Sequence, residues 1–193
     1  MSEEDIFTEA LVDRLSLNLT SAHVARKMSL LYDLSVDERG AVQMGVDIDT
    51  GEPIRGKGKG FEQDILIYEK VNEAHTSIVP RIVVEVKYNH VTTHDVIVYS
   101  EKANRIRRIY PYVRYGLLLG KFKTVPGRVL RLGQEFDFIC TLQHPFVDAQ
   151  IQDLRQLLMD EVQVSISLGK LLTGNIKTSI DLLQKSPIRA IVR

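Results

Sequence analysis

The sequence predicts an α/β protein, with a mixed central β-sheet flanked by helices and a helical C-terminal region. Short apolar runs predict strands over residues 63–71, 81–88 and 112–119. Segments with apolar residues at helical spacing lie before and between them, at 2–17 and 93–110. Because both kinds of segment occur in one chain of modest length, we expect the helices to pack against a single sheet.

Two helices are expected before the first strand. Ser2 can cap the first, over 2–17, and acids occupy its first turn. Two sets of apolar residues recur at helical spacing and could face the core: Ile6 with Ala10, or Phe7 with Leu11, each followed by Leu15. The second is expected over 21–34, with Val24, Met28 and Leu31 on one side. A strand over 41–48 and a glycine-rich loop over 49–60 follow.

Proline and glycine divide the second half of the chain into short elements. Pro111 ends the helix over 93–110, and Gly120 closes the strand over 112–119. The elements expected after them are strands over 129–132 and 136–142, a helix that follows Pro145 and runs to about residue 164, and a partly helical stretch to residue 193.

The length of 193 residues suits one domain. We expect an α/β core over 1–142 and a helical extension over 143–193 packed on the same domain. The single cysteine, Cys140, excludes an internal disulfide and is typical of a reducing compartment. The acidic start lacks the pattern of a secretory signal, and no apolar run approaches the ~20 residues of a membrane span. A cytoplasmic protein without membrane contact is therefore expected.

Positive charge is concentrated in one stretch, although the whole chain is neutral, with 25 basic and 25 acidic residues. Residues 101–131 contain nine lysines and arginines against one acid, Glu101, a balance of +8. Residues 1–13 contain five acids and no base. A basic stripe on a neutral protein favours nucleic-acid binding.

Two acids and a lysine stand on neighbouring predicted strands. Asp64 lies in the run Asp-Ile-Leu-Ile-Tyr, and Glu85-Val86-Lys87 lies in Arg-Ile-Val-Val-Glu-Val-Lys-Tyr. Because side chains alternate between the faces of a strand, Glu85 and Lys87 share one face. If the two strands pair, Asp64 and Glu85 can lie across from each other.

Two carboxylates at this separation repel each other unless a cation lies between them. Mg²⁺ binds such oxygens, lowers the pKa of a bound water and polarises a phosphoryl oxygen. Lys87 would reach the same place and could orient the attacking water or offset developing charge. The pattern therefore favours metal-assisted hydrolysis of a phosphodiester by Asp64, Glu85 and Lys87.

The alternation Val-Glu-Val-Lys is also typical of any half-solvated strand, so the motif alone does not identify a site. The order of features adds to it. An acidic helix and a basic glycine-rich loop precede Asp64, and a cationic helix and a strand follow Glu85-x-Lys87. Over residues 2–120 this order resembles the PD-(D/E)xK nuclease superfamily, the fold of many type II restriction endonucleases, Holliday-junction resolvases and DNA-repair nucleases.

The resemblance implies a catalytic set of Asp64, Glu85 and Lys87. It also implies that Asp64 and Glu85 bind the metal together with the carbonyl oxygen of Val86. In the superfamily's signature a proline stands where this chain has Gln63, and many members lack that proline.

The superfamily often adds an acidic residue from the first helix to the metal ligands. Glu9 is the better-placed candidate here, and Glu4 or Asp5 are the alternatives. The full metal set implied by the resemblance is therefore Asp64, Glu85, Val86 and Glu9.

Two groups of residues are candidates for contacts with DNA phosphates. They are Tyr99, Lys102, Arg105 and Arg108 of the basic helix, and Arg55, Lys57 and Lys59 of the glycine-rich loop. Such contacts position a duplex without reading its sequence. The alternatives are a solvated helix face partly neutralised by Glu101, and an ordinary surface loop.

The sequence therefore predicts a Mg²⁺-dependent DNA endonuclease with a restriction-endonuclease-like core, able to use Mn²⁺ as a substitute. Restriction is the first choice, with junction resolution and repair left open. No small organic cofactor is expected, and cutting two strands favours a homodimer. The alternative is a catalytically inactive DNA-binding or assembly subunit with the same fold.

Overall fold

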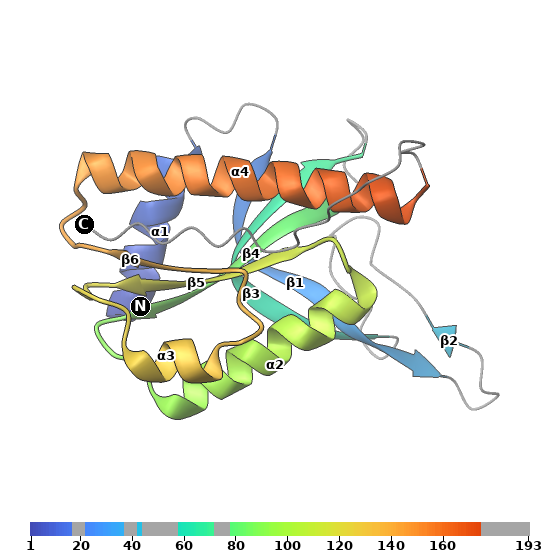
Figure 1. The fold of residues 1–193 in the computed structure, drawn as a ribbon, viewed down its shortest axis with the longest axis horizontal. Helices are drawn as coiled ribbons and strands as arrows, with labels where there is room; N and C mark the ends of the chain where they lie inside the picture. The colour runs from blue at the N-terminus through green and yellow to red at the C-terminus, as the bar shows by residue number, and fades with distance from the viewer. Residues whose placement is uncertain (17–21, 37–41, 44–57, 72–77, 175–193) are drawn as a thin grey trace.

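A computed structural model describes residues 1–16, 22–36, 42–43, 58–71 and 78–174 (Figure 1). The chain is an α/β protein with one mixed sheet, helices on both faces and a long helix near its C-terminal end, as predicted. None of the helices in the described part of the chain has the length and apolar character needed to cross a membrane.

In the part of the chain that the structure describes, six strands form the sheet, in the order β2-β1-β3-β4-β5-β6. The strands are β1 (His23–Val36), β2 (Val42–Gln43), β3 (Gly58–Lys70), β4 (Ile78–Tyr88), β5 (Arg114–Gly120) and β6 (Phe138–Leu142). The helices are α1 (Glu3–Ser16), α2 (Thr93–Ile109), α3 (Gly127–Leu132) and α4 (Asp148–Leu172). β1, β2, β3 and β4 pair antiparallel, whereas β4, β5 and β6 pair parallel. α2 connects the parallel strands β4 and β5, which cannot be joined by a tight turn.

Both faces of the sheet are covered by helices (Figure 1). On one face α1 and α4 enclose an apolar cluster that includes Phe7, Ile82 and Leu158. On the other face α2 packs against the sheet, with Val83 and Ile106 in a second cluster. Neighbouring residues of β4 thus enter opposite clusters, as the alternation of side chains along a strand requires.

The segment over 21–34, predicted as a helix, is strand β1 in the structure. The spacing of its apolar residues is compatible with a helix or with a strand. In the structure Val24 packs against the α1–α4 cluster, whereas Met28 packs against the α2 cluster on the other face of the sheet. β1 pairs with β3 from His23 to Leu34 and covers an edge that would otherwise expose unpaired backbone groups. A long-range pairing therefore overrides the local helical preference.

Residues 129–132, predicted as a strand, lie in helix α3. Pro126 precedes the helix, where its fixed φ and missing N–H cost nothing, and Val129 is fully buried. A short apolar run cannot be assigned by periodicity alone. α4 also extends to Leu172, beyond the predicted end near residue 164, while only Val42–Gln43 of the strand expected over 41–48 is described.

A buried ion-pair network attaches α4 to the sheet. Arg114 of β5 is 2% exposed, and its Nε lies 2.5 Å from Glu161 Oε2 of α4. Its Nη1 lies 2.9 Å from Asp137 Oδ1, just before β6. Because a buried guanidinium needs compensating charge, this network makes the position of α4 depend on β5 and β6.

Replacing Glu161 with alanine should lower the free energy of unfolding by about 3 kcal/mol, because Arg114 would then be buried with one of its two acidic partners missing. Urea denaturation followed by circular dichroism measures the change. The matched control is Gln152→Ala, an exposed position of the same helix, which should change the value by less than about 0.5 kcal/mol. Equal effects of the two substitutions would contradict a stabilising role for the network.

Candidate active site

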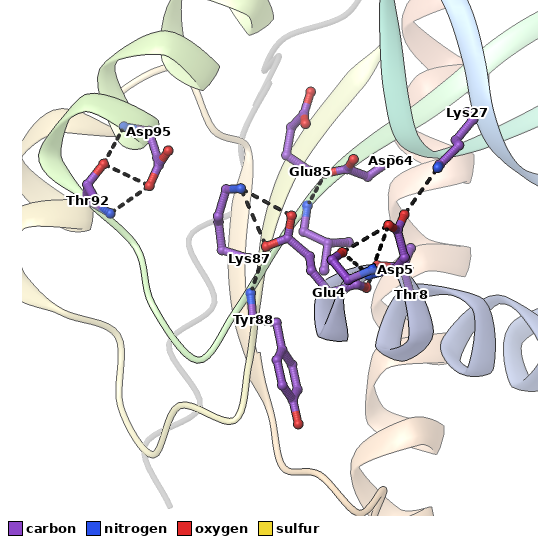
Figure 2. A network of polar contacts seen from close by, with 12 residues as sticks. Glu4, Asp5, Thr8, Lys27, Asp64, Glu85, Lys87, Tyr88, Thr92 and Asp95 are labelled. Carbon is purple, nitrogen blue, oxygen red and sulfur yellow. Dashed lines mark hydrogen bonds and ion pairs between the residues drawn. The ribbon is translucent and has the colours of Figure 1, made fainter.

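The two predicted acids meet between β3 and β4. Ile65 pairs with Val84, so the same antiparallel register brings Asp64 opposite Glu85 one step further on. The Asp64 carboxylate oxygen Oδ2 accepts a hydrogen bond from the backbone N–H of Val86 at 2.8 Å (Figure 2). This bond fixes the Asp64 carboxylate against β4.

Glu85 is a buried carboxylate, 1% exposed, beneath α2. Its Oε1 accepts hydrogen bonds from Lys102 Nζ and from the Tyr115 hydroxyl, both at 2.6 Å. The pKa of Glu85 is raised to about 7, mainly by burial; the Lys102 ammonium opposes this rise, and the nearby Asp64 carboxylate adds to it. The hydrogen bonds to this one oxygen therefore connect β4 with α2 and β5.

Lys87 lies at the end of β4, two residues after Glu85. Its Nζ is 3.2 Å from Glu4 Oε1 and 5.4 Å from the centre of the Tyr99 ring. Burial alone would lower the pKa of Lys87, but the Tyr99 hydroxyl and the Glu4 carboxylate together raise it above its ordinary value. Lys87 is therefore a cation at neutral pH and not a base.

Glu4 is the acid of the first helix that reaches this place. Its Oε2 also accepts a hydrogen bond from the backbone N–H of Tyr88 at 3.2 Å (Figure 2). Glu9, the first choice from the sequence, instead pairs with Arg26 at 3.3 Å. Asp5 lies 3.2 Å from Lys27 Nζ, in β1.

The spacing of residues along α1 could have identified Glu4 as the acid that reaches the site. The alternative inward side with Phe7 and Leu11 is the one observed, because both are buried whereas Ile6 is 54% exposed. Glu4 is three residues before Phe7 and therefore on the same side of the helix, whereas Glu9 points elsewhere.

α2 begins at a capping box, in which the Thr92 hydroxyl accepts from the Asp95 N–H while the Asp95 carboxylate accepts from the Thr92 N–H. This fixes the start of the helix that carries Tyr99 and Lys102 over the acids. Lys102 fits neither expectation, the phosphate contact or the solvated helix face, since its side chain is 13% exposed and pairs with Glu85. The pattern of charge on a helix does not reveal a buried carboxylate beneath it.

The other predicted DNA contacts have different positions. Arg105 pairs with Glu101 one turn earlier, at 2.7 Å, and Arg108 is exposed. Tyr99 is half-buried between Lys87 and Lys102, with its ring centre 5.3 Å from Lys102 Nζ. Arg55, Lys57 and the side chain of Lys59 lie outside the described residues.

The donors suit a hard divalent cation by chemical type, because Asp64 and Glu85 supply facing carboxylates. In the arrangement described, however, an ammonium group already contacts Glu85, and another contacts Glu4. Among the described residues no three His, Cys, Asp or Glu side chains are grouped closely enough to hold a metal. A cation bound between Asp64 and Glu85 therefore requires the Lys102 side chain to move.

Comparison with known proteins gives no family assignment. No model of a protein family matches the chain, and no curated protein matches it either. Function must therefore be inferred from the geometry of five side chains, those of Glu4, Asp64, Glu85, Lys87 and Lys102.

In the metal-free protein, kept so with EDTA, Glu85 should make stability fall as pH rises. The folded-state pKa of about 7 exceeds the value of 4.5 for a free side chain, so the folded protein holds this proton when the unfolded chain has released it. The stabilisation is complete below pH 4.5 and is lost as pH rises through 7, an effect of about 3 kcal/mol.

Urea denaturation at pH 5 and pH 8 tests this expectation. From pH 5 to pH 8 the free energy of unfolding of the wild-type protein should fall by roughly 2–3 kcal/mol more than that of Glu85→Gln, because glutamine has no proton to release. The exposed Glu62→Gln is the control and should behave as the wild type. Identical pH dependence in wild type and Glu85→Gln would show that the Glu85 pKa is not raised.

Proposed function

We propose that this chain is a metal-dependent DNA endonuclease of the PD-(D/E)xK superfamily. The observation that carries the proposal is the placement of Asp64 opposite Glu85 on paired strands, with Lys87 two residues further along the same face. Paired carboxylates beside a fixed cation are the chemistry that metal-assisted phosphodiester hydrolysis requires.

Asp64 and Glu85 would hold the divalent cation, with the Val86 carbonyl oxygen as a further candidate ligand. When bound, such an ion supplies an activated water and stabilises negative charge on the phosphate. The Val86 N–H orients the Asp64 carboxylate by its hydrogen bond. Glu9 has no part in this assignment, because it pairs with Arg26.

Lys87 would act as a positioned positive charge. Its raised pKa keeps the proton on Nζ, so the group can hold the attacking water or offset charge developing on the phosphate, but does not remove a proton. Glu4 and Tyr99 hold the ammonium in place from two sides. Glu4 is therefore a positioning residue in this proposal.

The exposed side of α2 would meet the DNA backbone. Arg108 is exposed, and Arg105 is one turn before it on the same helix. Contacts of this kind give salt-dependent affinity and orientation and carry no sequence information. A second copy of the chain would supply the active site for the other DNA strand.

A non-catalytic DNA-binding or assembly subunit is the second candidate. One observation favours it: the Glu85 carboxylate already has an ammonium and a hydroxyl partner, as a structural ion pair would. A protein of this kind would bind DNA with strong salt dependence and cut none.

Supercoiled plasmid and a four-way junction, each with Mg²⁺, Mn²⁺ or EDTA, test the first candidate. Wild-type protein should cut in either metal and not in EDTA. Asp64→Asn and Lys87→Ala should each reduce the rate by about 100-fold or more, because each removes charge stabilisation at the phosphate. Lys170→Ala, an exposed lysine of α4, is the matched control and should cut normally.

Unchanged cleavage by Lys87→Ala or Asp64→Asn would refute the assignment of the site. Binding of both DNAs without cleavage in any metal would support the second candidate instead.

Sedimentation velocity tests the proposed homodimer. At micromolar concentration, with and without DNA, the protein should sediment as a species of twice the 21.9 kDa chain mass. A monomer under both conditions would contradict it.

A further inference from the structure

Lys102 occupies a position that is built for a cation. Its ammonium group donates to Glu85 Oε1 at 2.6 Å and to the backbone carbonyl oxygen of Glu62 at 3.3 Å. It also lies 5.4 Å from the centre of the Phe61 ring and 5.3 Å from that of Tyr99. Two oxygens and two aromatic rings thus surround one positive charge, which is the environment that stabilises it away from water.

Electrostatics explains why the position is filled. Asp64 and Glu85 are close enough for each charge to affect the other, so a buried Glu85 carboxylate without a cation would be destabilised both by burial and by repulsion. Lys102 supplies the missing charge from α2. It does for Glu85 what a divalent cation between the two acids would do.

The same oxygen cannot serve both cations well. A divalent ion bound to a carboxylate lies about 2.0–2.6 Å from its oxygen. With Lys102 Nζ at 2.6 Å from Glu85 Oε1, an ion on that carboxylate would be within a few ångströms of an ammonium group. The two positive charges would repel each other strongly, because the Glu85 carboxylate is buried and the Lys102 side chain is largely so.

We propose that Lys102 is an internal competitor of the divalent cation at Glu85, and that it leaves for a DNA phosphate when a duplex binds. The proposal rests on the proposed nuclease function for the identity of the anion that attracts Lys102. The lysine side chain is long and flexible, and Lys102 stands about one turn before Arg105 on α2, with exposed Arg108 a turn further on. A phosphate bound at Arg105 would therefore lie about one turn along α2 from Lys102, a distance that the long lysine side chain can span by turning outward.

The proposal predicts that DNA and the divalent cation strengthen each other's binding. In the absence of DNA, Lys102 should keep the affinity of the site for a divalent cation low, which limits metal binding away from the substrate. A duplex that draws Lys102 outward would leave Asp64 and Glu85 free for the cation. Because coupling between two binding events is reciprocal, the cation should in turn strengthen the binding of DNA.

The first test measures Mn²⁺ binding to the full chain at pH 8 without DNA, by electron paramagnetic resonance of free Mn²⁺. Lys102→Met keeps much of the side-chain volume and removes the charge, and it should bind Mn²⁺ at least tenfold more tightly than the wild type. Lys102→Arg retains the charge and should remain as weak as the wild type. Arg105→Met, which removes a cation from the next turn of α2, should change the affinity less than twofold.

The site of the gain is assigned with Lys102→Met combined with Glu85→Gln, which should lose the tenfold increase. Mn²⁺-dependent changes in melting temperature give a second readout, and Lys102→Met should gain more than the wild type. A Lys102→Met protein that binds Mn²⁺ no more tightly than the wild type overturns the proposal, as does a gain that survives Glu85→Gln.

The movement of Lys102 toward DNA is tested by repeating the Mn²⁺ titration with a short duplex present. Lys87→Ala is included in both proteins compared, so that the duplex stays uncut during the measurement. With Lys102 in place, the duplex should raise the Mn²⁺ affinity at least fivefold, whereas with Lys102→Met it should raise it less than twofold. Equal increases in the two proteins would overturn the transfer of Lys102 to DNA.

The outcome is separable from that of the proposed function. Tighter Mn²⁺ binding by Lys102→Met, in a protein that cuts no DNA, would support the competition and reject the nuclease. Cleavage by the wild type with no effect of Lys102→Met on Mn²⁺ affinity would reject the competition and leave the nuclease in place.

Discussion

A buried carboxylate is the constraint around which this structure is arranged. Glu85 lies in the central strand β4, beneath α2, where its charge must be compensated by the protein. Lys102 fixes α2 over the sheet, and the Tyr115 hydroxyl brings in β5. Asp64 of β3 lies opposite, so α2, β5 and β3 meet at the Glu85 side chain. The packing of α2 and the chemistry of the site therefore depend on the same contacts.

Acid–base pairing recurs at the other structural junctions. Glu4 joins α1 to Lys87 at the end of β4, and Arg114 joins β5 to Glu161 of α4. The two cases differ in burial. Arg114 and Glu161 are closed from water, which is typical of a structural pair, whereas Glu4 and Lys87 lie at the C-terminal end of β4 and remain partly exposed. Only the second arrangement leaves its groups accessible to a substrate.

Local sequence was sufficient to predict the elements that have a clear residue alternation or a helix-ending proline. Pro111 marks the end of α2, and alternation along β4 assigns Glu85 and Lys87 to one face. Local sequence was insufficient where the same apolar residues fit both helical spacing and strand alternation. Val24 and Met28 suit a helix or a strand, and only pairing with β3 makes them part of β1. A short apolar run around Val129 had the same ambiguity, and it forms α3.

The sequence by itself determined the α/β class, the strands that carry Asp64 and Glu85, and the helix that follows them, because these depend on side-chain period and on turn residues. Only the tertiary structure decided which charges meet. Glu4 and not Glu9 reaches Lys87, and Lys102 is directed inward at Glu85. The physical reason is that a charged residue has no local signal for its partner: the ion pairs form between segments brought together by packing, where burial makes compensation necessary.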